Sequence, residues 1–135
     1  LKSFGAKVLI NDIKFIKNKV SLNSLLKSSE IISININLRN SKKILNKSKL
    51  DLLKKNCILI NTSRSEVIDY DYLYKILLKK NIFGAGLDVF NKEPYFGKIT
   101  NLKNVVLTPH IGGYAKEIRS KMEIEALNSI YKFIR

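Results

Sequence analysis

The chain has 135 residues, of which 25 are Lys or Arg and 11 are Asp or Glu, giving a net charge of +14. Its hydrophobic fraction of 45% and charged fraction of 27% are typical of a globular domain and exclude a disordered or collagen-like chain. The single cysteine, Cys57, excludes an intramolecular disulfide and a cysteine-built metal site. We therefore expect one domain or part of one, in the reducing cytoplasm, with no membrane span and no metal.

The basic charge follows the general composition and not a basic motif. Lys, Ile and Asn are all abundant, their codons are A/T-rich, and the lysines are scattered along the chain. A positive surface favours anionic ligands and non-specific contact with nucleic acid. Because no nucleic-acid recognition motif accompanies the charge, we expect no specific nucleic-acid partner.

Five short apolar runs predict strands. A helical turn is predicted before the first of them, because Leu1 and Phe4 are three apart and Gly5 suits the left-handed position after a helix. We expect a helical segment to precede residue 1. The first three runs are rich in Ile and Val without strict alternation, which is typical of strands covered on both faces. The predicted strands are residues 7–11, 31–35, 57–61, 84–89 and 105–107.

Helical segments alternate with these strands, and three of them follow a polar residue that can cap the helix. Leu73, Ile76 and Leu77 give one helix an apolar stripe at i, i+3, i+4 spacing. The alternation predicts an α/β fold with a parallel sheet and flanking helices. The predicted caps and helices are Ser21 with 22–28, Asn46 with 47–54 and Asp69 with 70–80. A last helix, 115–134, carries Ile118, Met122, Leu127, Ile130 and Ile134 on or near one face.

Polar side chains follow every predicted strand. Because the carboxyl ends of parallel strands lie at one edge of a sheet, where α/β proteins bind ligands, we expect these residues to form a site. In chain order they are Asp12, Asn35 and Asn37, residues 61–64, Asp88, and residues 108–110.

Four ionisable residues each have a structural interpretation as well as a functional one. Asp12 suits a turn as well as the ribose of an adenosine. Arg64 suits a surface ion pair or the recognition of a carboxylate. His110, the only histidine, is a structural residue or an acid/base on a rigid turn before Gly112. Glu93 is a simple loop carboxylate unless the fold brings it to His110, where it would favour the protonated imidazole.

Three segments together resemble the D-isomer-specific 2-hydroxyacid dehydrogenases. They are CILINTSR at 57–64 followed by VID at 67–69, GAGLDVF at 84–90 followed by Glu93 and Pro94, and NVVLTPHIGG at 104–113. The resemblance extends over essentially the whole chain and implies a Rossmann-like NAD-binding domain. It implies that residues 1–135 are most of that domain, without its first strand and glycine-rich loop, and that the substrate domain is absent.

The resemblance assigns catalytic roles to Arg64, Glu93 and His110. Arg64 would hold the substrate carboxylate and polarise the 2-oxo group, for which its planar fork is suited. His110 would give a proton to the carbonyl oxygen as hydride arrives from the nicotinamide, and Glu93 would keep that histidine protonated near neutral pH.

The resemblance also assigns an NAD site. Asp12 would bind the adenosine ribose and favour NAD over NADP, because a carboxylate repels a 2′-phosphate. Asp88 would orient the nicotinamide carboxamide. Asn35, Thr62 and Gly112 would line the rest of the cofactor pocket.

Several features depart from the family pattern. Ser65 stands where the family usually has Gly, and Asn35 and Asn37 stand where it often has His and Pro. The glycine-rich loop and its strand are absent; we expect that strand to lie between the strands ending at Asn11 and Asn61, so that its loss leaves a gap in the sheet. The chain alone is therefore expected to be catalytically inactive and only marginally stable.

The implied activity is NAD-dependent interconversion of a D-2-hydroxyacid and its 2-keto acid, in a phosphoglycerate-dehydrogenase-like enzyme that forms a homodimer when intact. The alternative is a non-catalytic, NAD-sensing binding module of the same fold, as in a corepressor. The presence of Arg64, Glu93 and His110 favours the enzyme.

Overall fold

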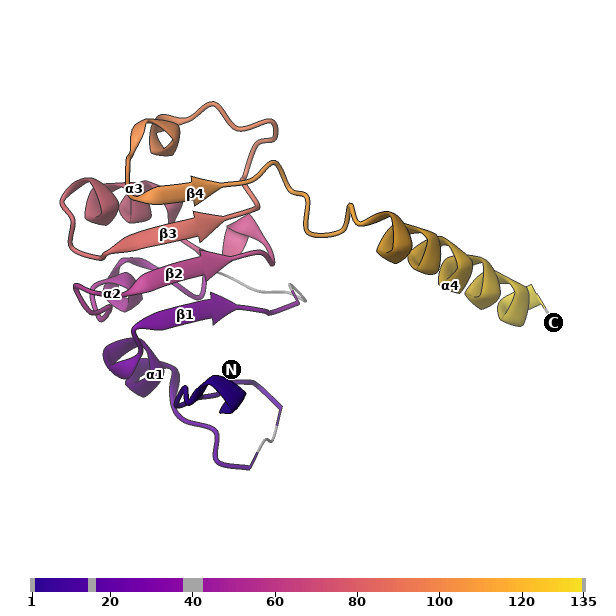
Figure 1. Cartoon of the computed structure of the whole chain (residues 1–135), viewed down its shortest axis with the longest axis horizontal. Coiled ribbons are helices and arrows are strands. Elements are labelled where there is room, and N and C mark those ends of the chain that lie inside the picture. The colour runs from indigo at the N-terminus through magenta and orange to yellow at the C-terminus, as the bar shows by residue number, and fades with distance from the viewer. Residues whose placement is uncertain (1, 15–16, 38–42, 135) are drawn as a thin grey trace.

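The computed structural model describes residues 2–14, 17–37 and 43–134, and its strands form one parallel sheet (Figure 1). The four strands lie in chain order across the sheet, each hydrogen-bonded to the next. Parallel strands joined by crossovers give the predicted Rossmann-like α/β fold. The strands are β1 (Ile31–Ile34), β2 (Ile58–Asn61), β3 (Gly84–Leu87) and β4 (Val105–Leu107).

The prediction of a strand at residues 7–11 is wrong. Within the described ranges, these residues pair with no strand; the backbone N–H of Val20 donates to the carbonyl of Ile10 at 2.9 Å. A strand needs a neighbour for its hydrogen bonds, and this segment has none. The predicted gap does not lie between β1 and β2, because Ile31 pairs directly with Ile58; a missing strand would lie between residues 7–11 and β1, where the described residues show no pairing.

Helix starts agree with the sequence, and helix ends agree less well. The side chains of Ser21, Asn46 and Asp69 each accept a backbone N–H in the first turn of the helix that follows. The second helix is shorter than predicted, because Leu52 and Leu53 donate to carbonyls three residues back and tighten the chain into turns. The helices are α1 (Leu22–Ser28), α2 (Lys47–Leu50) and α3 (Tyr70–Leu78).

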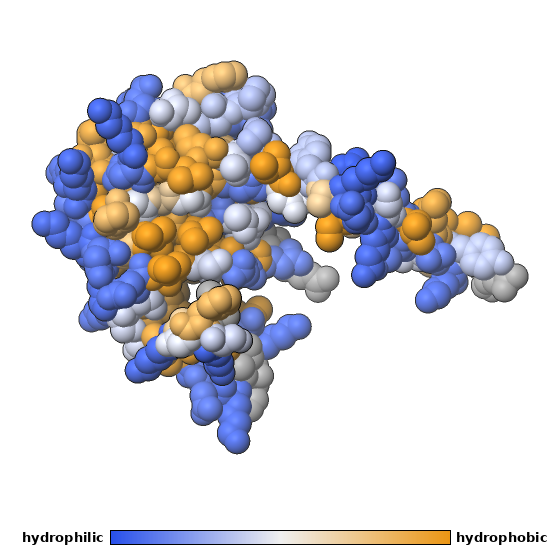
Figure 2. Space-filling model, viewed as in Figure 1, coloured by the Kyte–Doolittle hydropathy of each residue, from blue (hydrophilic) through white to orange (hydrophobic). Residues whose placement is uncertain are grey.

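Among the described residues, helices cover only one face of the sheet, which corrects the expectation of strands buried on both faces. In β1, Ile32 and Ile34 are buried, while Ile31 and Ser33 are exposed. The covered face packs in one core with α1, α2 and α3, including the predicted stripe of Leu73, Ile76 and Leu77. Figure 2 shows apolar side chains gathered over the strands on the opposite face.

The open face is defined by two rows of outward-pointing positions, because the strands are in register. It consists of Ile31, Ser33, Ile58, Ile60, Gly86 and Val106, all half-buried or exposed.

Both ends of the chain lie outside this core. Near the start, the 3₁₀ turn η1 (Lys2–Phe4) ends at Gly5, whose φ of 77° confirms the predicted left-handed position. At the other end, the long helix α4 (Lys116–Ile134) confirms the predicted last helix and points away from the sheet (Figure 1). None of its residues is buried, so its apolar stripe makes no core of its own.

Candidate functional site

The site lies where the strands end, as the sequence predicts. Beyond β2 comes a turn into η2 (Ser65–Val67), beyond β3 comes Asp88, and beyond β4 comes the turn that contains His110. The three strands are parallel neighbours, so their carboxyl ends open on the same edge of the sheet.

Glu93 and His110 form a direct pair across the loops that follow β3 and β4. The Nδ1 atom of His110 lies 2.9 Å from Oε2 of Glu93. The other oxygen, Oε1, accepts the backbone N–H of Phe90 at 2.9 Å, so the carboxylate is held from two sides. The hydrogen bond from His110, followed by that from Phe90, lowers the pKa of Glu93. An ionised Glu93 therefore faces Nδ1, which leaves Nε2 of His110 for a ligand.

Aromatic packing supports the loop that carries Glu93. The Phe90 ring stacks on Tyr95 with centroids 4.3 Å apart and meets Tyr70 edge-on at 6.0 Å. The Tyr70 hydroxyl donates to the carbonyl of Val89. Burial raises the pKa of Tyr70, so its hydroxyl stays a donor at neutral pH. The loop is thus attached to the core directly before Glu93.

Asp88 is the buried carboxylate of this edge, with 4% of its surface exposed. It accepts the hydroxyl of Thr108 and the backbone N–H groups of Ile111 and Gly112. Burial acts to raise its pKa, but these hydrogen bonds and the nearby His110 outweigh that effect and lower it. Asp88 is therefore an ionised acceptor at neutral pH.

Arg64 lies on the same edge but outside the hydrogen-bonded group. Its guanidinium donates to the carbonyl of Ser63 at 2.7 Å and is exposed. Within the part of the chain that the structure describes, no hydrogen bond or ion pair joins it to Glu93 or His110. The Arg64 fork can therefore rotate toward an added anion.

The structure places the predicted cofactor residues in three different surroundings. Asp88 and Gly112 are joined by a hydrogen bond, and a side chain at position 112 would approach the Asp88 carboxylate to 3.2 Å. Asn35 and Thr62 are exposed just beyond β1 and β2. Asp12 lies outside the sheet, where its carboxylate accepts the backbone N–H of Lys14 at 2.8 Å.

Asn61 shapes the site, although it was predicted only as one of the polar residues at a strand end. It is fully buried, donates to the carbonyl of Arg64 at 2.9 Å, and accepts the backbone N–H and hydroxyl of Ser63. These bonds set the path of the turn that presents Arg64. The signal in the sequence was a polar residue placed directly after the apolar run of an Ile-rich strand.

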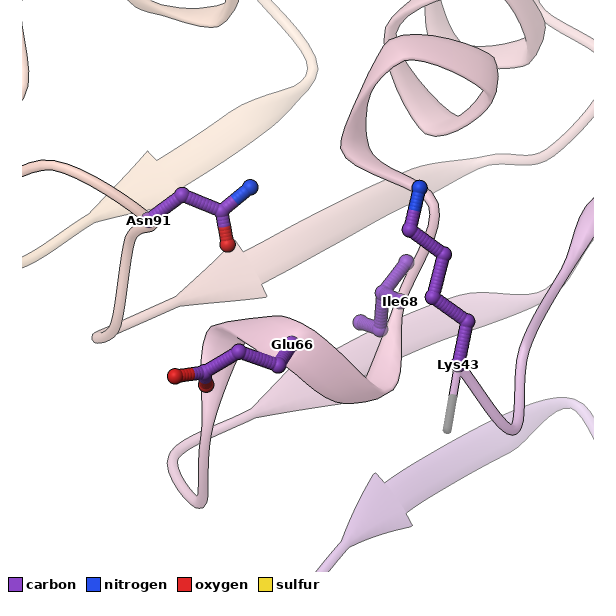
Figure 3. A pocket seen from close by; sticks show the side chains of 4 residues that line it. All are labelled: Lys43, Glu66, Ile68 and Asn91. Carbon is purple, nitrogen blue, oxygen red and sulfur yellow. The ribbon is translucent and has the colours of Figure 1, made fainter. Parts of the chain in front are cut away.

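A shallow cavity of about 420 Å³ lies beside this edge (Figure 3). It is lined by Lys43, Glu66, Ile68 and Asn91, and none of the candidate catalytic residues lines it. The geometry of Glu93 and His110, and not this hollow, therefore defines the candidate site.

Two kinds of feature are absent from residues 2–14, 17–37 and 43–134. No group of three or more His, Cys, Asp or Glu side chains there could hold a metal ion. No helix in the same ranges has the length and apolar character to cross a membrane.

Residues 1–112 match the family model described as the D-isomer specific 2-hydroxyacid dehydrogenase, NAD binding domain. The chain belongs to this family. The match ends just before α4 and includes every candidate site residue from Asp12 to Gly112.

Two relatives and one solved structure of the family show the extent of the similarity. A glyoxylate reductase of Thermococcus litoralis is 46% identical over 82% of this chain and 34% of its own length. A hydroxypyruvate reductase of Thermotoga maritima is 36% identical over 84% of this chain and 39% of its own length. A D-lactate dehydrogenase from Aquifex aeolicus, complexed with NAD and lactic acid, superposes with a TM-score of 0.86 at 27% identity, over 98% of this chain and 47% of that one.

The chain spans little more than a third of the length of these two reductases. The similarity covers the NAD-binding domain, which is the part that the family model describes.

Proposed function

We propose that this chain is the NAD-binding part of a dehydrogenase that interconverts a 2-oxo acid and its D-2-hydroxyacid. The observation that carries the proposal is the 2.9 Å contact between Nδ1 of His110 and the Glu93 carboxylate. An imidazole oriented by a carboxylate is a proton donor and acceptor with a fixed outward nitrogen. Substrate-binding residues beyond Arg64 would come from a second domain on further chain.

His110 is the acid/base of the proposed reaction. Glu93 accepts the Nδ1 proton, so Nε2 carries the proton that moves. In reduction, Nε2 donates to the substrate carbonyl oxygen while hydride arrives at C2, and a hydroxyl group results. In oxidation, Nε2 takes that hydroxyl proton back.

Arg64 holds the substrate in this proposal. Its exposed guanidinium lies on the same sheet edge as His110 and makes no ion pair among the described residues. A guanidinium binds a carboxylate through two parallel hydrogen bonds, and it also stabilises charge on a neighbouring carbonyl oxygen. The small 2-oxo acids glyoxylate and hydroxypyruvate are the first candidates, because they are the acids named for the reductases that the chain resembles.

The nicotinamide cofactor supplies or accepts the hydride when it is bound. The residues of the sheet edge fit its nicotinamide side: Asp88 accepts three hydrogen bonds, and a carboxylate offers about four acceptor positions. The remaining position on Oδ2 suits a carboxamide N–H. We assign Asn35, Thr62 and Gly112 to the same pocket and Asp12 to the ribose, with NAD preferred over NADP. The sequence holds no Gly-x-Gly-x-x-Gly run for the pyrophosphate.

The test is oxidation of NADH by the full-length protein that contains this chain. The substrates are glyoxylate, hydroxypyruvate, pyruvate and 3-phosphohydroxypyruvate. We expect turnover on at least one of them and a loss of about 10²–10⁴-fold in kcat in His110→Gln, because one acid/base group is removed. Lys98→Ala, in the exposed turn η3 (Lys98–Asn101), serves as the control that keeps full activity.

No turnover by a protein that still binds NADH would contradict the proposal and favour the NAD-sensing module. The same preparation gives the oligomeric state, for which we propose a homodimer. We place the protein in the cytoplasm, because its one cysteine has no second cysteine with which to form an intramolecular disulfide.

A further inference from the structure

The turn that carries His110 is tied to Asp88 on both sides of the histidine. Before it, the Thr108 hydroxyl donates to Oδ1 of Asp88. After it, the backbone N–H of Ile111 donates to the same oxygen at 2.9 Å, and that of Gly112 donates to Oδ2 at 3.0 Å. Among the described residues, the neighbours of His110, and not His110 itself, make the hydrogen bonds to Asp88. The carboxylate therefore closes the turn around the histidine.

The backbone of His110 has a conformation that needs such support. Its φ of 56° lies in the left-handed region, which is unfavourable for a residue with a side chain. Residues held in this region persist where the surrounding structure overdetermines them. The three bonds to Asp88 lie within two residues of His110 and supply that constraint.

The orientation of the imidazole depends on the same constraint. Glu93 lies 17 residues before His110 and on another loop, so Nδ1 reaches its carboxylate only when the turn has the observed path. The His110 side chain is 47% exposed, so core packing does not hold it. Asp88, in contrast, is buried and ionised, which makes its hydrogen bonds strong.

We infer that Asp88 is a positioning residue that holds the His110 turn in its left-handed conformation and thereby aims Nδ1 at Glu93 and Nε2 at the substrate. The role of Asp88 in catalysis rests on the proposed function. Its role in holding the turn follows from the hydrogen bonds alone. Gly112 belongs to the same hydrogen-bonded turn, where a side chain would be crowded because its Cβ would approach the Asp88 carboxylate to 3.2 Å.

The test uses amide hydrogen exchange and NMR of the 135-residue chain, whose single histidine gives one set of imidazole signals. In Asp88→Asn, the side-chain amide cannot accept both backbone N–H groups. We expect the Ile111 and Gly112 amides to exchange about tenfold faster or more, as for the loss of a hydrogen bond to a charged group. The Nδ1 proton signal of the His110–Glu93 hydrogen bond should broaden or disappear.

A milder variant keeps the test informative if Asp88→Asn does not fold. Thr108→Val removes only the hydroxyl donor and should weaken the same His110 signal, whereas Thr108→Ser keeps the donor and should restore it. Asp69→Asn removes a carboxylate that caps α3 and should leave both readouts as in the wild type. In the full-length enzyme, Thr108→Val should lower kcat more than it changes KM for the 2-oxo acid.

Two results would overturn the inference. One is wild-type exchange of the Ile111 and Gly112 amides in a folded Asp88→Asn variant. The other is a Thr108→Ser variant that behaves like Thr108→Val. If the exchange results are as expected but the full-length wild type reduces no 2-oxo acid, the turn is held as described and the proposed function fails.

Discussion

The two faces of the sheet contain similar residues and differ in what covers them. Ile31 and Ile32 are neighbours in β1, yet Ile31 is 64% exposed and Ile32 is 6% exposed. Successive side chains of a strand point to opposite faces, and α1, α2 and α3 pack on one face only. The open face is apolar in Figure 2, as is much of the stripe on α4. Hydrophobic composition therefore does not tell which surface of this molecule becomes a core.

The largest expected effect separates the two faces directly. Ile32→Ala should lower the free energy of unfolding by about 2–5 kcal/mol, because it leaves a cavity in the core. Ile31→Ala should change it by about 0.5 kcal/mol or less. Urea unfolding of the two variants compares the two faces through the same substitution at adjacent positions of one strand. Equal losses would show that the open face is covered in solution.

The second prediction extends the comparison to α4. Ala126→Pro lies in the middle of this helix and should disrupt it, since proline costs about 3 kcal/mol inside a helix. The midpoint of unfolding of the sheet should stay the same, because no residue of α4 is buried. Far-UV circular dichroism measures the loss of helix, and denaturation followed by tyrosine fluorescence measures the core. A lower midpoint would mean that α4 packs against the sheet.

A third prediction uses Cys57, which is fully buried directly before β2. Burial raises its pKa to about 11, although Lys54 opposes the shift. The folded state therefore keeps the thiol protonated while the unfolded chain ionises near pH 8.5–9. The contribution of this thiol to the free energy of unfolding should be fully present below that range and should decrease as the pH rises above it.

The measurement is urea unfolding between pH 8 and 9.5, below the usual titration of tyrosine. Cys57→Ala should remove this part of the pH dependence. An unchanged slope in the variant would show that another group is responsible.

The smallest expected effect lies at the end of α3. Lys80 has a φ of 54°, and its N–H and that of Asn81 close the helix on the carbonyls of Leu77 and Ile76. Glycine takes this left-handed position at lower cost. Lys80→Gly should therefore raise the free energy of unfolding by about 1 kcal/mol. Lys79→Gly, at the adjacent right-handed position, is the matched control and should not stabilise the protein.

Much of the fold could be predicted because its signals are local. Ser21, Asn46 and Asp69 cap helices through atoms three residues away, and β4 was predicted with its observed limits. The strand at residues 7–11 was predicted wrongly, because its apolar pattern was suitable but the neighbour it needs is not in the sheet. Strand pairing depends on a partner, and no window of the sequence contains that information.

The candidate site also has a part that could be predicted from the sequence and a part that could not. Residue types and motifs identified Glu93, Asp88 and His110, and the resemblance to the dehydrogenase family rests on those motifs. The pairing of Glu93 with His110 spans 17 residues, and the hydrogen bond from Gly112 to Asp88 spans 24. Asn61 and Thr108 were predicted only as polar residues at strand ends; the structure shows that both orient their neighbours through hydrogen bonds.

The sequence by itself determined the helix caps, the apolar stripe of α3, the order of strands and helices, and the chemical groups at the ends of the strands. These depend on neighbours within a few positions along the chain. Only the tertiary structure decided that one face of the sheet is covered, that β1 pairs with β2, and that Asp88 closes the turn around His110. Those features depend on groups that are distant in the chain and meet only when parallel strands align their carboxyl ends at one edge.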